Sequence, residues 1–261
     1  MEDERAPLNL RVIVTAGGAG IGRSIVEHFV AAGAHVLATD LDVDALTPLA
    51  DRAEGRLILL PGDASAEETA SSACASMIEA FGGVDVLVNG VGIAGPTAAV
   101  EDITLDDWNT SLTVNLTSHF LFSRVVVPAM KEQGSGLIVN ISSSSARTGL
   151  PLRLPYVVTK AAVLSMTTNM ARELGPDGIR VNAILPGAVR GERNDRVKVA
   201  KAKSIGIAPE ELERRSLLYT SLRTMMDPED IAEAIGFLAS PAAARITGQF
   251  LSVDGNTEWE E

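Results

Sequence analysis

Short runs of apolar, largely β-branched residues alternate along this chain with longer segments of helical pattern. Strands without polar alternation are typical of parallel strands buried on both faces. The pattern therefore predicts an α/β protein with a doubly wound parallel sheet of about seven strands and helices on both faces. The predicted strands are 10–15, 35–39, 57–60, 84–88, 137–141, 179–184 and 249–253, and the main predicted helices are 21–32, 66–81, 105–131 and 155–174.

One segment, residues 187–223, interrupts this alternation. It is long, charged and only patchily helical in pattern. An insertion of this kind in an α/β protein commonly covers the ligand site as a lid. Elsewhere the 261 residues contain no linker-like or repeated stretch, so we expect residues 1–261 to form a single domain.

The charge balance excludes several classes of protein. A formal net charge of −12 repels phosphate backbones, so we expect no nucleic-acid partner. The acidic start, residues 1–5, lacks the apolar stretch of a signal peptide, and no apolar run reaches the roughly 18 residues of a membrane helix. A single cysteine and three scattered histidines predict neither an internal disulfide nor a metal site. A cytoplasmic protein fits these features.

The first predicted strand runs into a glycine-rich turn, Thr15–Gly22, that precedes a predicted helix. Glycines let the main chain approach a pyrophosphate closely, and the helix N-terminus offers free N–H groups and a positive dipole end. The common G-x-G-x-x-G spacing is absent, because Gly18-Ala19-Gly20-Ile21-Gly22 is followed by Arg23. A plain tight turn is the alternative to a dinucleotide site.

Asp40 indicates which dinucleotide would bind. It ends the second predicted strand, where a carboxylate accepts hydrogen bonds from ribose hydroxyls and repels a 2′-phosphate. Neither 16–20 nor 38–44 contains a lysine or arginine that could neutralise such a phosphate. We therefore expect NAD(H) as the cofactor.

Tyr156 and Lys160 are candidates for acid–base chemistry. They stand four residues apart at the start of a predicted helix, which places both on one face. A free phenol holds its proton at neutral pH, and a neighbouring ammonium ion stabilises the phenolate. The spacing alone occurs often by chance. Ser143 strengthens it, because it follows the fifth strand at the sheet edge that lines the ligand crevice.

These motifs together resemble the short-chain dehydrogenase/reductase family, over roughly residues 8–256. Ser143, Tyr156 and Lys160 match its Ser…Tyr-x-x-x-Lys spacing, and Asn115 matches its fourth catalytic position. Further matches are Thr15–Gly22 to T-G-x-x-x-G-I-G, Val88–Gly92 to N-N-A-G, Pro186-Gly187 to the proline–glycine after the sixth strand, and Thr247–Gln249 with Val253–Gly255 to the last strand. Ala16 replaces the first glycine of the turn, and Gly90 replaces the second asparagine of N-N-A-G.

The resemblance implies a Rossmann-type fold and a role for each matched residue. Tyr156 would exchange a proton with the substrate oxygen, Lys160 would assist it and hold the nicotinamide ribose, Ser143 would hydrogen-bond the substrate oxygen, and Asn115 would position a water. Cofactor contacts are implied for Thr15, Gly17, Gly20, Ile21, Gly22, Asp40, Leu41, Asp63, Ala64, Asn89, Gly90, Val91, Tyr156, Lys160, Pro186, Gly187 and Val189.

The leading functional hypothesis is an NAD(H)-dependent oxidoreductase that interconverts a secondary alcohol and a ketone. A 3-oxoacyl (acyl carrier protein or coenzyme A) reductase is an alternative, which Asp40 disfavours because biosynthetic reduction usually draws on NADPH. A non-catalytic NAD-binding sensor or scaffold is a third possibility, which the complete catalytic set disfavours. The resemblance also implies a homo-oligomer, a tetramer or a dimer, built through segments near 105–131, 155–174 and 246–254.

Basic residues suggest the charge of the small-molecule substrate. The lid segment carries Arg190, Arg193, Arg196, Lys198, Lys201 and Lys203. Arg147 and Arg153 stand between Ser143 and Tyr156, and we expect both on the opposite wall of the same crevice. Arginine binds carboxylate or phosphate at two points. We expect an anionic substrate group held by Arg153 or Arg193. The alternative is that these side chains form a solvated helix face or pair with acids of a neighbouring subunit.

Overall fold

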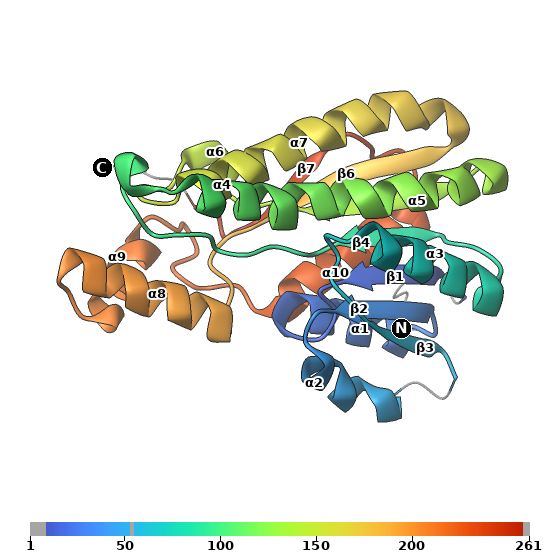
Figure 1. Ribbon diagram of the computed structural model, residues 1–261, viewed down its shortest axis with the longest axis horizontal. Coiled ribbons are helices and arrows are strands. Elements are labelled where there is room, and N and C mark those ends of the chain that lie inside the picture. The colour runs from blue at the N-terminus through green and yellow to red at the C-terminus, as the bar shows by residue number, and fades with distance from the viewer. Residues whose placement is uncertain (1–8, 53–54, 258–261) are drawn as a thin grey trace.

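A computed structural model describes residues 9–52 and 55–257, so the acidic residues 1–5 lie outside the described residues. The described strands form one seven-stranded sheet in the order β3-β2-β1-β4-β5-β6-β7, and every pairing is parallel (Figure 1). The strands are β1 (Arg11–Thr15), β2 (His35–Asp40), β3 (Leu57–Pro61), β4 (Val86–Asn89), β5 (Gly136–Ile141), β6 (Ile179–Pro186) and β7 (Phe250–Val253).

The sheet confirms the predicted doubly wound α/β fold. The central strands β1, β4, β5 and β6 are buried along nearly their whole length, as continuous apolar runs predict. Strand order reverses beside β1, where β2 lies on one side and β4 on the other, so Val14 pairs with both Ala38 and Val88. Ligands of such sheets bind in the crevice at the carboxyl ends of the strands near this switch point.

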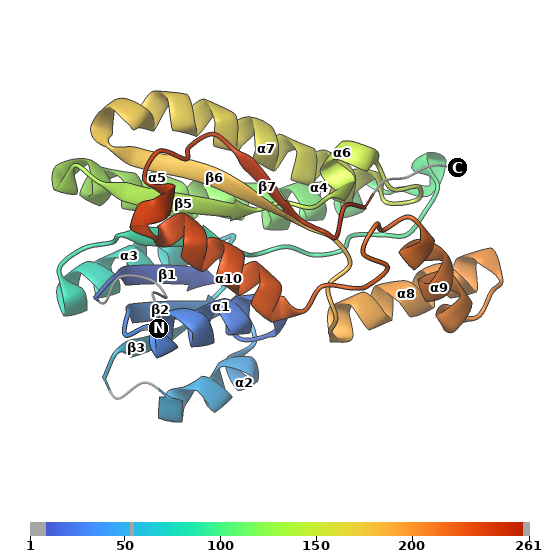
Figure 2. The same cartoon turned by 180° about the vertical axis from the view of Figure 1, so that it is seen from behind.

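Helices cover both faces of the sheet. Helices α3, α5 and α7 pack on one face around Phe122 and Met130, and α1 and α10 pack together on the other around Phe29 and Ile235 (Figures 1 and 2). The helices are α1 (Gly20–Ala31), α2 (Val43–Leu46), α3 (Glu67–Phe81), α4 (Leu105–Leu112), α5 (Ser118–Gln133), α6 (Ser145–Thr148), α7 (Leu154–Leu174), α8 (Glu192–Ile205), α9 (Pro209–Leu218) and α10 (Pro228–Ala239). In the described part of the chain, no helix has the combined length and apolarity needed to cross a membrane.

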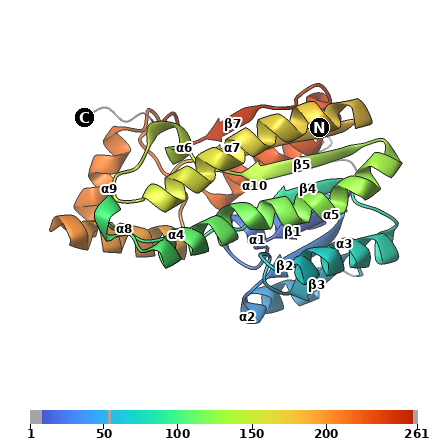
Figure 3. The same ribbon diagram turned by 45° about the horizontal axis from the view of Figure 1, so that its top comes forward.

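Two expectations about helices were wrong. The predicted helix 105–131 is not continuous, because a π-helical turn, Thr113–Thr117, joins α4 to α5 along the side of α7 (Figure 3). A π turn widens the helix locally and re-aims a side chain, here that of Asn115. The lid segment 187–223 is more helical than its pattern indicated, since α8 and α9 occupy most of it beyond the strand ends.

Buried amide side chains join the centre of the sheet to α7. The side-chain nitrogen of Asn89 on β4 donates to the side-chain oxygen of Asn140 on β5 at 2.9 Å, and the nitrogen of Asn140 donates to Oγ1 of Thr167 on α7 at 2.9 Å. All three side chains are buried. A buried polar group left without a partner costs free energy, so this chain of bonds fixes how α7 lies on the sheet.

Replacing Thr167 by valine tests this role. Thr167→Val keeps the side-chain shape but leaves a buried nitrogen of Asn140 without its acceptor, so the free energy of unfolding should fall by about 1–3 kcal/mol. Thr168→Val is the matched control, because Thr168 bonds one turn back in the same way but is exposed. Its effect should stay within about 0.5 kcal/mol. Urea denaturation of the variants measures both, and equal effects would contradict the assignment.

Candidate active site

The implied cofactor residues lie at the carboxyl ends of five strands. The turn after β1 carries Thr15 to Gly22, and the ends of β2 and β3 carry Asp40, Leu41, Asp63 and Ala64. Asn89, Gly90 and Val91 follow β4, and Pro186, Gly187 and Val189 end or follow β6. The fold therefore gathers residues that are far apart in the sequence along one edge of the sheet.

The turn after β1 has the shape that a pyrophosphate needs. A side chain at Gly22 would collide with the carbonyl oxygen of Ala16, and one at Gly17 would come within 2.9 Å of the Cβ of Ala38. Helix α1 starts at Gly20 with no side-chain cap and no acid in its first turn, so its first N–H groups remain open to an anion. These features fit a dinucleotide. Ala16 adopts φ 55°, a left-handed conformation that glycine accepts more easily.

Asp40 is held at the mouth of this turn. One carboxylate oxygen accepts from the main-chain N–H of Gly18 at 2.9 Å, and the other accepts from that of Asp42 at 3.0 Å. Arg23, which lies outside the segments 16–20 and 38–44, also reaches this corner. Its guanidinium donates to the carbonyl oxygens of Gly18 and Ala45, at 2.8 and 3.0 Å. Two nitrogens of the Arg23 guanidinium are therefore occupied by main-chain carbonyl oxygens.

The loop after β4 faces the site with its main chain. Asn89 is buried and its side chain points into the core, so its main chain alone could face a cofactor. Thr15 is buried too, and its Oγ1 accepts from the N–H of Gly90 at 2.9 Å. A Cβ on Gly90 would lie 2.6 Å from the carbonyl oxygen of Thr15, so the departure at position 90 accompanies a close approach of two strands.

Lys160 is a buried ammonium group beside the candidate acid, Tyr156. Both residues lie on α7, one turn apart, where Lys160 is 3% exposed and Tyr156 is half-buried. Nζ of Lys160 donates to the carbonyl oxygen of Ile141, the last residue of β5, at 2.8 Å. Burial, followed by the charge of Arg193, lowers the pKa of Lys160 to about 7. The amine is therefore poised to exchange a proton near neutral pH.

Asn115 is fixed in the π turn by three polar atoms. Its side-chain oxygen accepts from the N–H of Ile93 at 2.6 Å, and its nitrogen donates to the carbonyl oxygen of Ile93 and to Oγ1 of Thr159, each at 3.1 Å. A Cβ built on Gly92 would lie 3.1 Å from Nζ of Lys160 and 3.3 Å from the oxygen of Asn115. The two candidate residues therefore flank the same glycine.

Ser143 lies just beyond β5 and is 9% exposed. Its Oγ is 2.9 Å from Oγ of Ser145 and accepts from the N–H of Ser145 at 3.3 Å. The neighbouring hydroxyl group of Ser142 points elsewhere, donating to the carbonyl oxygen of Lys160 at 2.8 Å. Local hydrogen bonding thus ties Ser143 to Ser145 of α6 and ties Ser142 to α7.

Of the three arginines near the expected anion site, two lie beside Tyr156 and one lies elsewhere. Cζ of Arg153 lies 5.3 Å from the centre of the Tyr156 ring, and Cζ of Arg193 lies 6.0 Å from it. Arg147 lies elsewhere, 5.9 Å from the Phe250 ring, and donates to Ser252. The expectation that Arg147 shares the crevice wall with Arg153 was wrong, because the chain turns through α6 between them.

His119 is a site neighbour that the sequence did not reveal. It is fully buried on α5, and its Nε2 lies 3.1 Å from the carbonyl oxygen of Val91 in the loop after β4. Burial, and then the charge of Lys160, lowers its pKa to about 3, so the imidazole stays neutral. A neutral ring donates from Nε2 in this contact and braces the loop. Among the described residues no group of three histidine, cysteine or acidic side chains could hold a metal.

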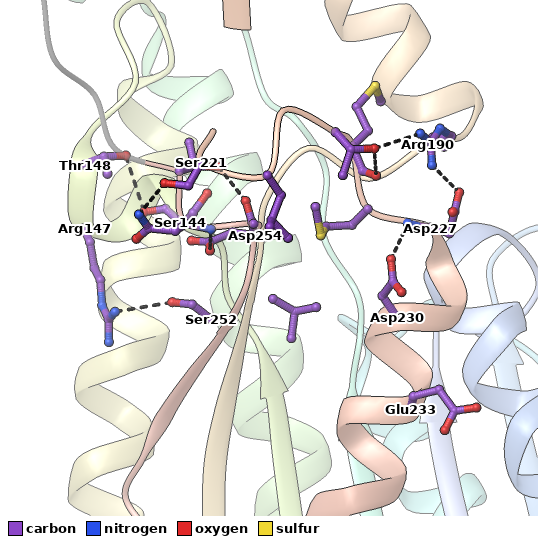
Figure 4. Close-up of a pocket in the computed structure, with 18 residues that line it drawn as sticks. Ser144, Arg147, Thr148, Arg190, Ser221, Asp227, Asp230, Glu233, Ser252 and Asp254 are labelled. Carbon is purple, nitrogen blue, oxygen red and sulfur yellow. Dashed lines mark hydrogen bonds and ion pairs between the residues drawn. The ribbon is translucent and has the colours of Figure 1, made fainter. Parts of the chain in front are cut away.

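A further cavity of the protein is lined by none of the four candidate catalytic residues. Its volume is about 1210 Å³, and its walls come from α6, β7, the start of α10 and the segment before α10 (Figure 4). Arg190 and Asp227 form an ion pair at 2.7 Å on one side of it, and Arg147 contacts Ser252 on the other. The cavity is therefore separate from the four candidate catalytic residues.

The depressed pKa of Lys160 makes the stability depend on pH. Between about pH 7 and the usual pKa of 10.5, the unfolded chain holds one proton more at this site than the folded chain, so the free energy of unfolding should rise with pH. Lys160→Met removes this contribution. The stability of the wild type relative to Lys160→Met should therefore increase with pH, by up to about 1.4 kcal/mol per unit.

Urea denaturation of both proteins at several pH values between 7 and 10 measures this difference. Loss of the bond to Ile141 adds a constant offset and no slope. A difference that stays constant across the range would contradict a buried, easily deprotonated Lys160.

Known proteins resemble the chain over almost its whole length. A family model described as enoyl-(acyl carrier protein) reductase matches residues 15–256. The chain is 36% identical to the 7alpha-hydroxysteroid dehydrogenase of Escherichia coli (strain K12) over 246 residues, which cover 93% of this chain and 92% of that one. It is 34% identical over 248 residues to a probable galactose dehydrogenase of Rhizobium meliloti (strain 1021), with coverage of 94% of this chain and 93% of that one.

A solved structure supports the same relationship. It is a 7alpha-hydroxysteroid dehydrogenase complexed with NADH and 7-oxo glycochenodeoxycholic acid, and it matches with a TM-score of 0.86 and 34% identity. The match covers 97% of this chain and 96% of that chain. Sequence, fold and the placement of the matched motifs agree, and the chain belongs to the short-chain dehydrogenase/reductase family.

Proposed function

We propose that this protein is an NAD(H)-dependent oxidoreductase that interconverts a secondary alcohol and a ketone. The observation that carries the proposal is the half-buried phenol of Tyr156 one turn from the buried amine of Lys160, at the strand edge where the glycine turn also lies. Relatives named as dehydrogenases of hydroxyl compounds, and a similar structure with NADH, support it.

The strand ends would hold the cofactor along the crevice. The open N–H groups of α1 would bind the pyrophosphate, and the carboxylate of Asp40 would accept from the ribose hydroxyls at the adenine end. Lys160 would hold the nicotinamide ribose, with Pro186, Gly187 and Val189 beside the ring. When bound, the nicotinamide supplies or accepts the hydride.

Tyr156 would give a proton to the ketone oxygen in reduction and take one from the alcohol in oxidation. Lys160 supports it as a nearby amine that exchanges protons near neutrality. Asn115 holds the Ile93 main chain beside Lys160 and would position a water there, and Ser143 would bind the substrate oxygen. Each of these roles requires that the side chain lies where β5, α7 and the π turn come together.

A 3-oxoacyl reductase remains the alternative, since the matching family model is described by an acyl carrier protein reductase. The carboxylate of Asp40, beside Gly18, would repel the 2′-phosphate of NADPH. It therefore disfavours a 3-oxoacyl reductase that draws on NADPH. Oxidation of simple secondary alcohols with NAD separates the two functions. It also separates them from a non-catalytic NAD-binding sensor or scaffold, which would show no turnover.

Four further proposals rest on the sequence and the family. We propose a single domain covering residues 1–261, with 187–223 as its lid, a location in the cytoplasm, and a small-molecule substrate that carries an anionic group. We also propose a homo-oligomer, a tetramer or a dimer. The half-buried Ala161, Ala162, Met166 and Met170 of α7 suit close symmetric packing.

The cofactor preference follows from Asp40. The wild type should bind NADH at least about tenfold more tightly than NADPH, and Asp40→Ala should reduce this ratio because the repulsion of a 2′-phosphate is removed. Asp44→Ala removes the same charge from an exposed position four residues on and should leave the ratio unchanged. Fluorescence titration of the reduced cofactors measures the dissociation constants. Equal or tighter binding of NADPH by the wild type would overturn the assignment.

The proton transfer tests Tyr156. Tyr156→Phe keeps the ring but removes the transferable proton, so turnover of an alcohol that the wild type oxidises should fall by about 10² or more. NADH binding should persist in this variant. Tyr219→Phe changes the other tyrosine of the chain and serves as the matched control. Near-normal turnover of Tyr156→Phe would show that another group transfers the proton.

A further inference from the structure

Helix α8 carries two sets of basic residues. In the first set, acids neutralise the charge. Arg196 pairs with Glu192 at 3.6 Å, and Lys198 pairs with Asp195 at 3.1 Å and with Glu213 of α9 at 2.6 Å. These residues form the solvated, salt-bridged helix face that was the alternative reading of the basic lid.

The second set faces Tyr156. Arg193 and Lys201 are eight residues apart, with Val197 between them, so all three share one face of α8. Cζ of Arg193 lies 6.0 Å from the centre of the Tyr156 ring. Burial, and after it the charge of Arg153, lowers the pKa of Lys201. This face of the lid therefore brings Arg193 to the candidate acid, with Lys201 about two turns further along the helix.

Arg153, the residue just before α7, is the third member of the cluster. It is 5% exposed, and its Cζ lies 5.3 Å from the Tyr156 ring centre. One guanidinium nitrogen donates to the carbonyl oxygen of Ala94 at 2.6 Å, whereas the buried Nε has no hydrogen-bond partner in the described part of the chain. Burial, and after it the charge of Arg193, lowers the pKa of Arg153.

Among the described residues, the two arginines lack acidic partners. Within residues 9–52 and 55–257, neither Arg153 nor Arg193 forms an ion pair with a carboxylate. Like charges gathered around a partly buried ring repel one another, and an unpaired nitrogen inside the protein costs free energy. A bound anion would relieve both costs, and arginine nitrogens match a carboxylate in geometry.

We propose that Arg153, Arg193 and Lys201 form a subsite for a carboxylate of the substrate, beside Tyr156. The inference rests on the proposed function and narrows it to hydroxy acids and the corresponding keto acids. Arg193 and Lys201, on the lid, bind the carboxylate directly. Arg153, which is hydrogen-bonded to Ala94, contributes a further positive charge close to the bound carboxylate. Because Arg153 and Arg193 lie beside the Tyr156 ring, the carboxylate and the reacting carbon belong to the same small molecule.

Matched acids and amides test the subsite. The probes are lactate, 3-hydroxybutyrate and 5-hydroxyhexanoate, each compared with its own primary amide, and binding to the protein with and without NADH is measured by calorimetry. At least one acid should bind about tenfold or more tightly than its amide. Arg193→Gln and Lys201→Gln should each reduce that ratio at least threefold. Both positions lie on the lid helix, so these variants leave the buried Arg153 in place.

Arg196→Gln is the control, because it removes a cation from the same helix that is paired with Glu192. It should keep the preference for the acid. The proposal is overturned if no acid is preferred over its amide, if the preference survives in the Arg193→Gln/Lys201→Gln double variant, or if Arg196→Gln reduces it equally.

The two proposals fail in different ways. If the amides are oxidised with NAD at least as well as the acids, the subsite is wrong and the oxidoreductase function stands. If neither acids nor amides are oxidised but the binding preference is present and sensitive to Arg193, the subsite stands and the proposed function is wrong.

Discussion

The hydrogen bond from Lys160 to the carbonyl oxygen of Ile141 holds the candidate site together. It joins the first turns of α7 to the last residue of β5 at the edge where the parallel strands end. The hydroxyl of Ser142 returns a second bond, to the main chain of Lys160. A buried amine needs such an acceptor, because an unpaired charge in the core is costly. Tyr156 and Ser143 take their positions from this junction.

The junction is braced on both sides by buried polar groups. Asn89, Asn140 and Thr167 connect β4, β5 and α7 in the core, and Asn115 connects the π turn to the loop that follows β4. His119 contacts the same loop from α5 as a neutral ring. Among the described residues, the side-chain oxygen of Asn89 and Nδ1 of His119 have no hydrogen-bond partner, so the bracing depends on the bonds that the other polar atoms make. These bonds surround the candidate catalytic residues on α7, in the π turn and just beyond β5.

The sheet could be predicted because its central strands, such as β4 and β5, are continuous apolar runs, and a doubly wound fold places their carboxyl ends together. The spacing of Ser143, Tyr156 and Lys160 located the candidate site in the same way. The π turn was not predictable, because side-chain bonds of Asn115 to a distant loop accompany it. The sequence also did not show which cations of α8 pair with acids and which one lies beside Tyr156, because these contacts depend on how α8 packs in the folded protein.

The central claim is that these strand ends bring one cofactor and one proton-transfer group together. A crystal structure of the protein with NADH tests it most directly. The account predicts the nicotinamide ribose within hydrogen-bonding distance of Nζ of Lys160 and Oη of Tyr156, the pyrophosphate at the N-terminus of α1, and the adenine ribose at Asp40. A nicotinamide bound away from Tyr156, in the separate cavity lined by Arg147 and Asp227 for example, would contradict it.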